Sequence, residues 1–210
     1  MTTAAQMWPM IHSERASLAD TLDGLNSDQG ASPSLCAGWS VQLTAAHVLA
    51  GAEQTGFGFM KGLASSAFRF NVMMDKDAHR LGALEQRVIV DRLRARTTTT
   101  NHPPAPIAAM LSEVVVHGAD IRQPLGLPNG SSMDAVVTAL NMFKAASFPV
   151  AGKKHVEGLR LVATDADWSH GTGPEVTGPA LSLLLAMTGR SSGTDALGGS
   201  GVGELRNRIA

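Results

Sequence analysis

The segment from Met110 to Ile121, MLSEVVVHGADI, places the strongest constraint on the fold. Glu113 and His117 stand four residues apart and Asp120 follows three residues later, so a helix would carry all three on nearly one face. Aliphatic residues occupy the other sides, which predicts a helix buried nearly all round. A buried carboxylate is costly unless it is paired or bound to a metal ion. The fold must therefore surround this helix and supply partners for its polar stripe.

Apolar residues recur at helical spacing over the first two-thirds of the chain. Ser40 is suited to N-cap one of the expected helices, Gly82 to interrupt another, and Pro124 to end the helix that carries Glu113. A Thr- and Pro-rich linker at 97–106 precedes that helix. The pattern predicts an up-and-down helical bundle. The expected helices span residues 7–25, 41–61, 65–84, 84–96, 107–123 and 133–147.

The pattern changes near residue 150. Residues 159–164 alternate in the manner of a strand, 175–177 suit a second short strand, and 179–190 form a compact apolar helix. We therefore expect a mainly α chain with two parts. These are a helical bundle over residues 1–150 and a small α/β C-terminal subdomain over residues 151–210.

Composition limits the classes of function. The formal net charge is −1, whereas non-specific nucleic-acid binders carry a basic excess, so a nucleic-acid partner is not expected. No run approaches the roughly 18 apolar residues of a membrane span, and the N-terminal residues do not resemble a secretory signal, so we expect a cytoplasmic protein without membrane contact. The single cysteine, Cys36, excludes an internal disulfide and a Cys-rich zinc site. Any metal site would then depend on histidines and carboxylates.

His47 is a further candidate ligand, because it lies about two turns inside its expected helix on the face of Leu43, Ala46 and Ala50. A single histidine there is also compatible with a satisfied core residue, and Glu113 with His117 is compatible with a buried ion pair. Two histidines and one glutamate on two helices of one bundle would instead form a facial metal site. Such a site leaves a coordination position open for water or substrate, as catalytic zinc sites do.

Two motifs carry a family resemblance. The run LCAGWSV at 35–41, followed by AHVL at 46–49, resembles the C-x-G-W-S/T-V…H-L motif of the mycothiol-dependent maleylpyruvate isomerase family. The run EVVVHGADI at 113–121 resembles that family's E-x-x-x-H-x-x-D helix, and ATDADW at 163–168 with the GPA and TGR runs at 178–180 and 188–190 resembles its C-terminal segment. The resemblance spans nearly the whole chain.

The resemblance implies a DinB-like four-helix bundle in which His47, Glu113 and His117 bind a divalent metal. Zinc fits this ligand set, and nickel, iron or manganese also suit it. Mycothiol would be the thiol cofactor, with its thiolate bound at the metal and attacking a small electrophile such as maleylpyruvate. In the isomerase the thiolate adds to a double bond, rotation follows and the thiol leaves. The implied activity is isomerase or transferase; the alternative is a diverged, non-catalytic DinB-like protein that binds a metal, a ligand or a partner.

Other residues receive roles by the same reasoning. Asp120 would orient His117 or form a helix-end salt bridge, and Arg190 and Arg206 would bind a substrate carboxylate or remain solvated at the surface. Trp39 is expected to pack its loop onto the bundle. Cys36 precedes a glycine-containing loop with no base visible beside it, so we expect a structural role and a reactive sulfur supplied by the cofactor. DinB-like bundles often form dimers, so a homodimer is a further expectation.

Overall fold

The computed structural model describes residues 3–210. The chain divides into two compact units, one up to Ser131 and one from Ser132 to Ala210. This division comes earlier than the boundary expected near residue 150. The reason is that α8 (Met133–Phe143) packs against α10 (Ala180–Met187), which belongs to the second unit.

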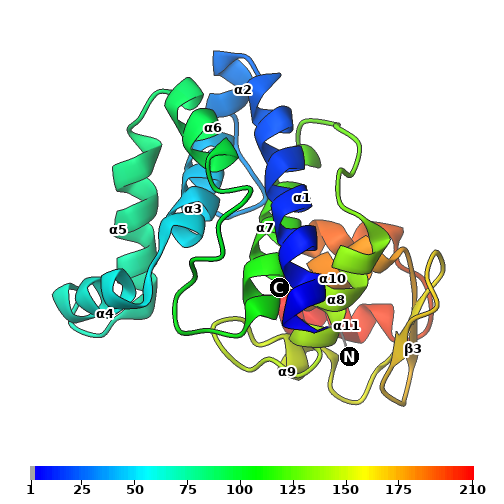
Figure 1. The fold of residues 1–210 in the computed structure, drawn as a ribbon. Helices are drawn as coiled ribbons and strands as arrows, with labels where there is room; N and C mark the ends of the chain where they lie inside the picture. Colours follow the sequence, from blue (N-terminus) through cyan, green and yellow to red (C-terminus); the bar gives the residue numbers. More distant parts are fainter. Residues whose placement is uncertain (1–2) are drawn as a thin grey trace. The chain divides into compact units, whose positions relative to one another are not determined.

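Helices make up the first unit, as expected. Within it α3 contacts α5, α6 and α7, while α1 contacts α6 and α7 (Figure 1). These contacts close a ring of four helices, α1, α6, α3 and α7, and α5 packs against α3. Its helices are α1 (Ala4–Asp23), α2 (Ser27–Ala31), α3 (Val41–Glu53), α4 (Gly56–Ser65), α5 (Phe70–Gly82), α6 (Gln86–Arg94) and α7 (Ile107–Arg122).

Two glutamines hold the helix ends at the break between α5 and α6. Gln42 Nε2 donates to the carbonyl oxygens of Gly82 (2.8 Å) and Leu84 (3.0 Å). Gln86 Nε2 donates to the carbonyl oxygens of Leu22 (2.7 Å) and Leu25 (2.9 Å) at the end of α1. Terminal carbonyls of helices have no partner inside the helix, so Gln42 satisfies groups at the end of α5 and Gln86 satisfies groups at the end of α1.

The helix expected over 41–61 is in fact two helices. The Ser40 side chain accepts a hydrogen bond from the Leu43 amide, so the predicted N-cap of α3 is confirmed. However, α3 ends at Glu53, and the hydroxyl of Thr55 accepts a bond from the Gly58 amide to start α4. Threonine competes for backbone donors in this way, and the glycines of α4 favour helix continuation only weakly.

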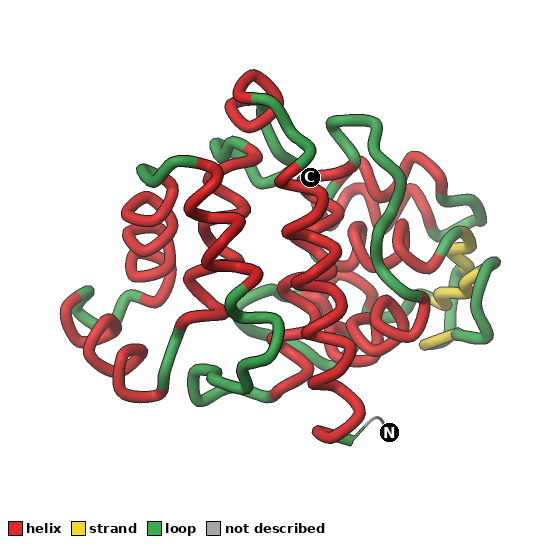
Figure 2. The backbone as a smooth tube through the Cα atoms, turned by 45° about the horizontal axis from the view of Figure 1, so that its top comes forward, coloured by secondary structure: helices red, strands yellow, loops and turns green. Residues whose placement is uncertain are grey.

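A three-stranded sheet and the remaining helices form the second unit, whose strands appear in yellow in Figure 2. β1 (Arg160–Ala163) is central, parallel to β3 (Glu175–Gly178) and antiparallel to β2 (Ser169–His170). Leu161 pairs with His170 on one side and Val176 on the other. The two predicted strands are confirmed, whereas β2 was not anticipated. The other elements here are α8, α9 (Gly152–Val156), α10, the 3₁₀ helix Ser191–Ala196 and α11 (Val202–Ile209).

Among residues 3–210, no helix has the length and apolar character that crossing a membrane requires.

Replacing Leu49 tests the core of the first unit. Leu49 lies in α3 and is 0% exposed. Leu49→Ala is expected to lower the free energy of unfolding by about 2–5 kcal/mol, because it removes buried methyl groups and leaves a cavity. Val88→Ala, at a side chain that is 38% exposed, should change it by less than about 0.5 kcal/mol. Urea denaturation measures both; equal effects would contradict this packing.

Candidate functional site

Two neighbouring helices bring the expected metal-ligand residues together. His47 lies on α3, and Glu113 and His117 lie on α7, which contacts α3. His47 Nε2 is 3.6 Å from Glu113 Oε1. The rings of His47 and His117 meet edge to face, with centroids 4.8 Å apart. Two imidazoles and one carboxylate therefore converge inside the bundle, as the spacing of the sequence motifs suggested.

Glu113 has a buried carboxylate oxygen that its surroundings leave unsatisfied. Its side chain is 21% exposed, yet Oε1 is buried and has no hydrogen-bond partner among the described residues. Burial raises the pKa of this carboxyl, and the positive charges of His117 and Arg15 oppose that rise. A cation beside Oε1 would supply the interaction that the hydrogen bonds do not.

Asp120 fixes the orientation of His117. Its Oδ2 lies 2.9 Å from His117 Nδ1, and the Asp120 side chain is 0% exposed. Burial alone would lower the pKa of His117, but the hydrogen bonds with Asp120 and Cys36 outweigh it and raise that pKa to about 10. Because Nδ1 faces the carboxylate, Nε2 is the ring nitrogen available to a metal ion. Carboxylates commonly hold metal-binding histidines in this manner.

Gly51 makes room for the Glu113 carboxylate and was missed by the sequence analysis. It lies one turn after His47 in α3, and a Cβ built on it would come within 2.5 Å of Glu113 Oε1. Glycine inside a helix costs about 1 kcal/mol relative to alanine. A glycine four residues after a candidate ligand, inside a helix, therefore indicates in the sequence that another group packs closely against that face of the helix.

Arg15 was also missed, because nothing in its local sequence distinguishes it. It lies on α1 and is 2% exposed, and its Nη1 donates to the carbonyl oxygens of Arg96 (3.1 Å) and Thr99 (3.5 Å). Burial lowers the pKa of Arg15 to about 10, and the nearby charge of Glu113 opposes this. Arg15 thus places a buried positive charge within electrostatic reach of the glutamate.

The Cys36 thiol lies beside two polar side chains, His117 and Asp120, which the local sequence did not indicate. Its Sγ donates to Asp120 Oδ2 at 3.1 Å and lies 3.5 Å from His117 Nδ1. Within residues 3–210, Cys36, His117 and Asp120 are the group whose three ligand atoms lie within 4.8 Å of one another, so they form a possible metal-binding set. The predicted ligands His47, Glu113 and His117 do not meet this distance together. The same three atoms already hydrogen-bond to each other.

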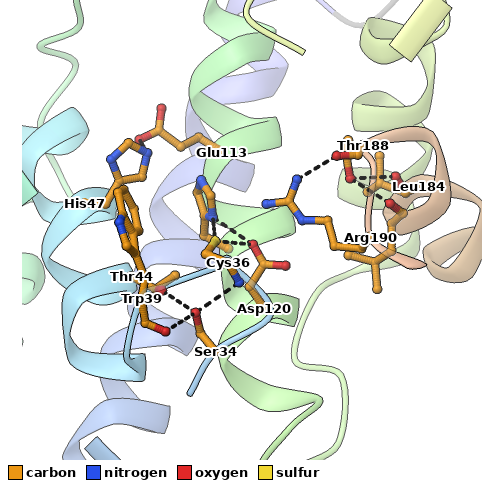
Figure 3. Close-up of polar contacts among 12 residues, drawn as sticks. Ser34, Cys36, Trp39, Thr44, His47, Glu113, Asp120, Leu184, Thr188 and Arg190 are labelled. Atoms are coloured by element: carbon orange, nitrogen blue, oxygen red, sulfur yellow. Dashed lines mark hydrogen bonds and ion pairs between the residues drawn. The ribbon is translucent and has the colours of Figure 1, made fainter. Parts of the chain in front are cut away.

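The remaining predicted residues lie in different surroundings. The Trp39 ring centroid is 5.1 Å from that of His47, so Trp39 packs its loop directly against a candidate ligand. Arg190 and Arg206 belong to the second unit. Arg190 Nη1 donates to the Thr188 carbonyl oxygen at 2.9 Å (Figure 3), and Arg206 donates to the hydroxyl and carbonyl oxygens of Thr194. Both arginines therefore make bonds within their own unit.

Comparison with known proteins identifies the fold. No family model and no curated protein sequence matches the chain. Two solved structures do, each with a TM-score of 0.61 over 93% of this chain and 92% of theirs. One is the mycothiol-dependent maleylpyruvate isomerase, at 14% identity, and the other is a histidine-to-alanine variant of such an isomerase, at 15% identity.

The chain shares their fold. It is a DinB-like helical domain with a small C-terminal α/β part, as the motifs predicted. At this level of identity the likeness establishes a distant structural relationship, and the chemistry must be argued from the residues of this chain.

Replacing Gly51 tests the close approach between α3 and Glu113. Gly51→Ala is expected to lower the free energy of unfolding, because overpacking costs about 1–3 kcal/mol and exceeds the roughly 1 kcal/mol gained in helix propensity. Gly56→Ala is the matched control, since a Cβ there meets nothing within 4 Å. Urea unfolding followed by circular dichroism compares the two. A Gly51→Ala protein as stable as the control would contradict the geometry described here.

Proposed function

We propose that this protein is a metal-dependent isomerase or transferase that uses a thiol cofactor. The metal would be held by His47, Glu113 and His117. The observation that carries the proposal is the buried Glu113 Oε1, which has no hydrogen-bond partner within residues 3–210 and lies 3.6 Å from His47 Nε2. The fold shared with the mycothiol-dependent isomerase supports the same reading.

The donor set fits a divalent metal. Two imidazole nitrogens and one carboxylate suit zinc, with nickel, iron and manganese as alternatives. His117 presents Nε2 because Asp120 occupies Nδ1. The set formed by Cys36, His117 and Asp120 fits less well, because hydrogen bonds already satisfy those atoms. We therefore place the metal at the glutamate.

A bound metal would lower the pKa of a coordinating thiol and so supply a nucleophilic thiolate at neutral pH. The residues of the chain prepare the site for it. Asp120 holds His117 in position, and Trp39 packs against His47. Mycothiol is the proposed cofactor, because the structural neighbours depend on it, and maleylpyruvate exemplifies the small electrophilic substrate. Arg190 and Arg206 are proposed to bind a substrate carboxylate.

Elemental analysis tests the metal site. The purified protein is expected to contain about one divalent ion per chain, as a site with three protein ligands would. His47→Ala and Glu113→Ala should each lose most of it, because two ligands hold a metal far more weakly than three. His79→Ala is the matched control, since its side chain is 60% exposed and pairs with Asp75 one helical turn earlier.

Full metal occupancy in both ligand variants would refute this assignment. Loss of metal from the His79→Ala control as well would show that the measurement reports on general instability.

Thiol consumption separates catalysis from the alternative of a diverged, non-catalytic binding protein. With metal bound, the protein should accelerate isomerisation of maleylpyruvate or consumption of mycothiol by electrophiles, and Glu113→Ala should abolish the acceleration. Arg190→Ala and Arg206→Ala should raise the KM for a carboxylate substrate without changing that for the thiol. A protein that binds metal but consumes no thiol with any electrophile would favour the non-catalytic alternative.

A further inference from the structure

The loop that joins α2 to α3 is fixed to both helices that carry the candidate ligands. The Val41 amide donates to the Ser32 carbonyl oxygen at 2.9 Å, closing the loop at its base. Ser34 Oγ is 2.7 Å from Thr44 Oγ1 on α3. The Leu35 amide donates to the Asp120 carbonyl oxygen on α7 at 3.0 Å. The position of the next residue, Cys36, is therefore set by bonds to both helices.

Within this loop the Cys36 thiol faces the carboxylate that orients His117. The Cys36 amide donates to Ser34 Oγ at 3.1 Å, and its Sγ donates to Asp120 Oδ2 at 3.1 Å (Figure 3). That same Oδ2 is 2.9 Å from His117 Nδ1. Asp120 is fully buried, so its carboxylate depends on such bonds for stabilisation and for a single orientation.

We infer that Cys36 is a positioning residue of the metal site. Its thiol holds the Asp120 carboxylate against His117 Nδ1 and thereby directs His117 Nε2 toward the ion. The inference rests on the proposed function, since it assigns His117 to a metal, and it adds a residue to which neither the fold nor the motifs give this role.

The geometry distinguishes this role from those of a nucleophile or a metal ligand. The sulfur lies at the Nδ1 edge of His117, whereas the nitrogen assigned to the metal is Nε2. The thiol hydrogen is donated to a carboxylate, which is a task that a serine hydroxyl also performs. The loop contacts the other histidine as well, because Trp39 packs on His47.

Zinc affinity, measured by competition with a chromophoric chelator, tests the inference. Cys36→Ala should weaken zinc binding about 10- to 100-fold, the usual effect of removing a partner behind a metal-binding histidine. Cys36→Ser should stay close to the unaltered protein, because its hydroxyl still donates to Asp120. Unchanged affinity in Cys36→Ala would overturn the inference, and so would equal loss in both variants, since that result would make the sulfur itself the ligand.

Two further measurements keep the result unambiguous. Thermal unfolding of the metal-free variants should show a cooperative transition for both, with a lower midpoint for Cys36→Ala, which has lost a donor to a buried carboxylate. Zinc affinity is then compared at a temperature well below both midpoints, which separates lost affinity from lost folding. Cobalt-loaded protein should lack thiolate-to-cobalt absorption; a band that disappears in Cys36→Ser would refute the positioning role by showing sulfur coordination.

A metal-independent readout separates this inference from the proposed function. In ¹⁵N-labelled, metal-free protein, the Nδ1–H signal of His117 should be protected from exchange, retained in Cys36→Ser and lost or broadened in Cys36→Ala. A protein that binds no metal but shows this pattern would refute the proposed function and retain the link from Cys36 to His117. Identical Nδ1–H signals in all three proteins would refute that link.

Discussion

Burial of the polar stripe on α7 is the constraint on which the first unit depends. Glu113, His117 and Asp120 lie on a helix whose other sides are filled by aliphatic residues, so each must find its partner inside the bundle. His47 from α3 approaches Glu113, Arg15 from α1 adds a positive charge near it, and Cys36 binds Asp120. Three separate segments of the chain are thus brought to one helix by the cost of leaving its polar groups unpaired.

The partners divide the stripe into two regions of different character. Around Asp120 the hydrogen bonds are short and mutual, joining the carboxylate to His117 and to Cys36. Around Glu113 they are incomplete, because Oε1 is buried without a hydrogen-bond partner among the described residues, and the carboxylate packs closely on Gly51. A hydrogen-bonded cluster that fixes the histidine, next to a carboxylate whose oxygen lacks a hydrogen bond, is the arrangement expected of a preorganised cation site.

Local spacing made much of this predictable. The stripe on α7, the N-cap at Ser40 and the position of His47 within α3 follow from residues one turn apart, and the structure confirms the helices that carry them. The contact of Cys36 with Asp120 joins residues 84 positions apart and depends on the conformation of an irregular loop, which no periodicity encodes. The end of α3 at Glu53 was missed for a different reason, because the Thr55 hydroxyl caps a new helix in a glycine-rich run that favours helix continuation only weakly.

The position of Cys36 also bears on where a reactive sulfur would come from. The only cysteine of the chain has its thiol engaged with Asp120, on the Nδ1 side of His117. Using that thiol as a nucleophile would remove a donor from a fully buried carboxylate and loosen the histidine that the carboxylate holds. Positioning the site and attacking the substrate are therefore competing demands on one sulfur. A diffusible thiol resolves the conflict, because it supplies a nucleophile while Cys36 keeps its hydrogen bond.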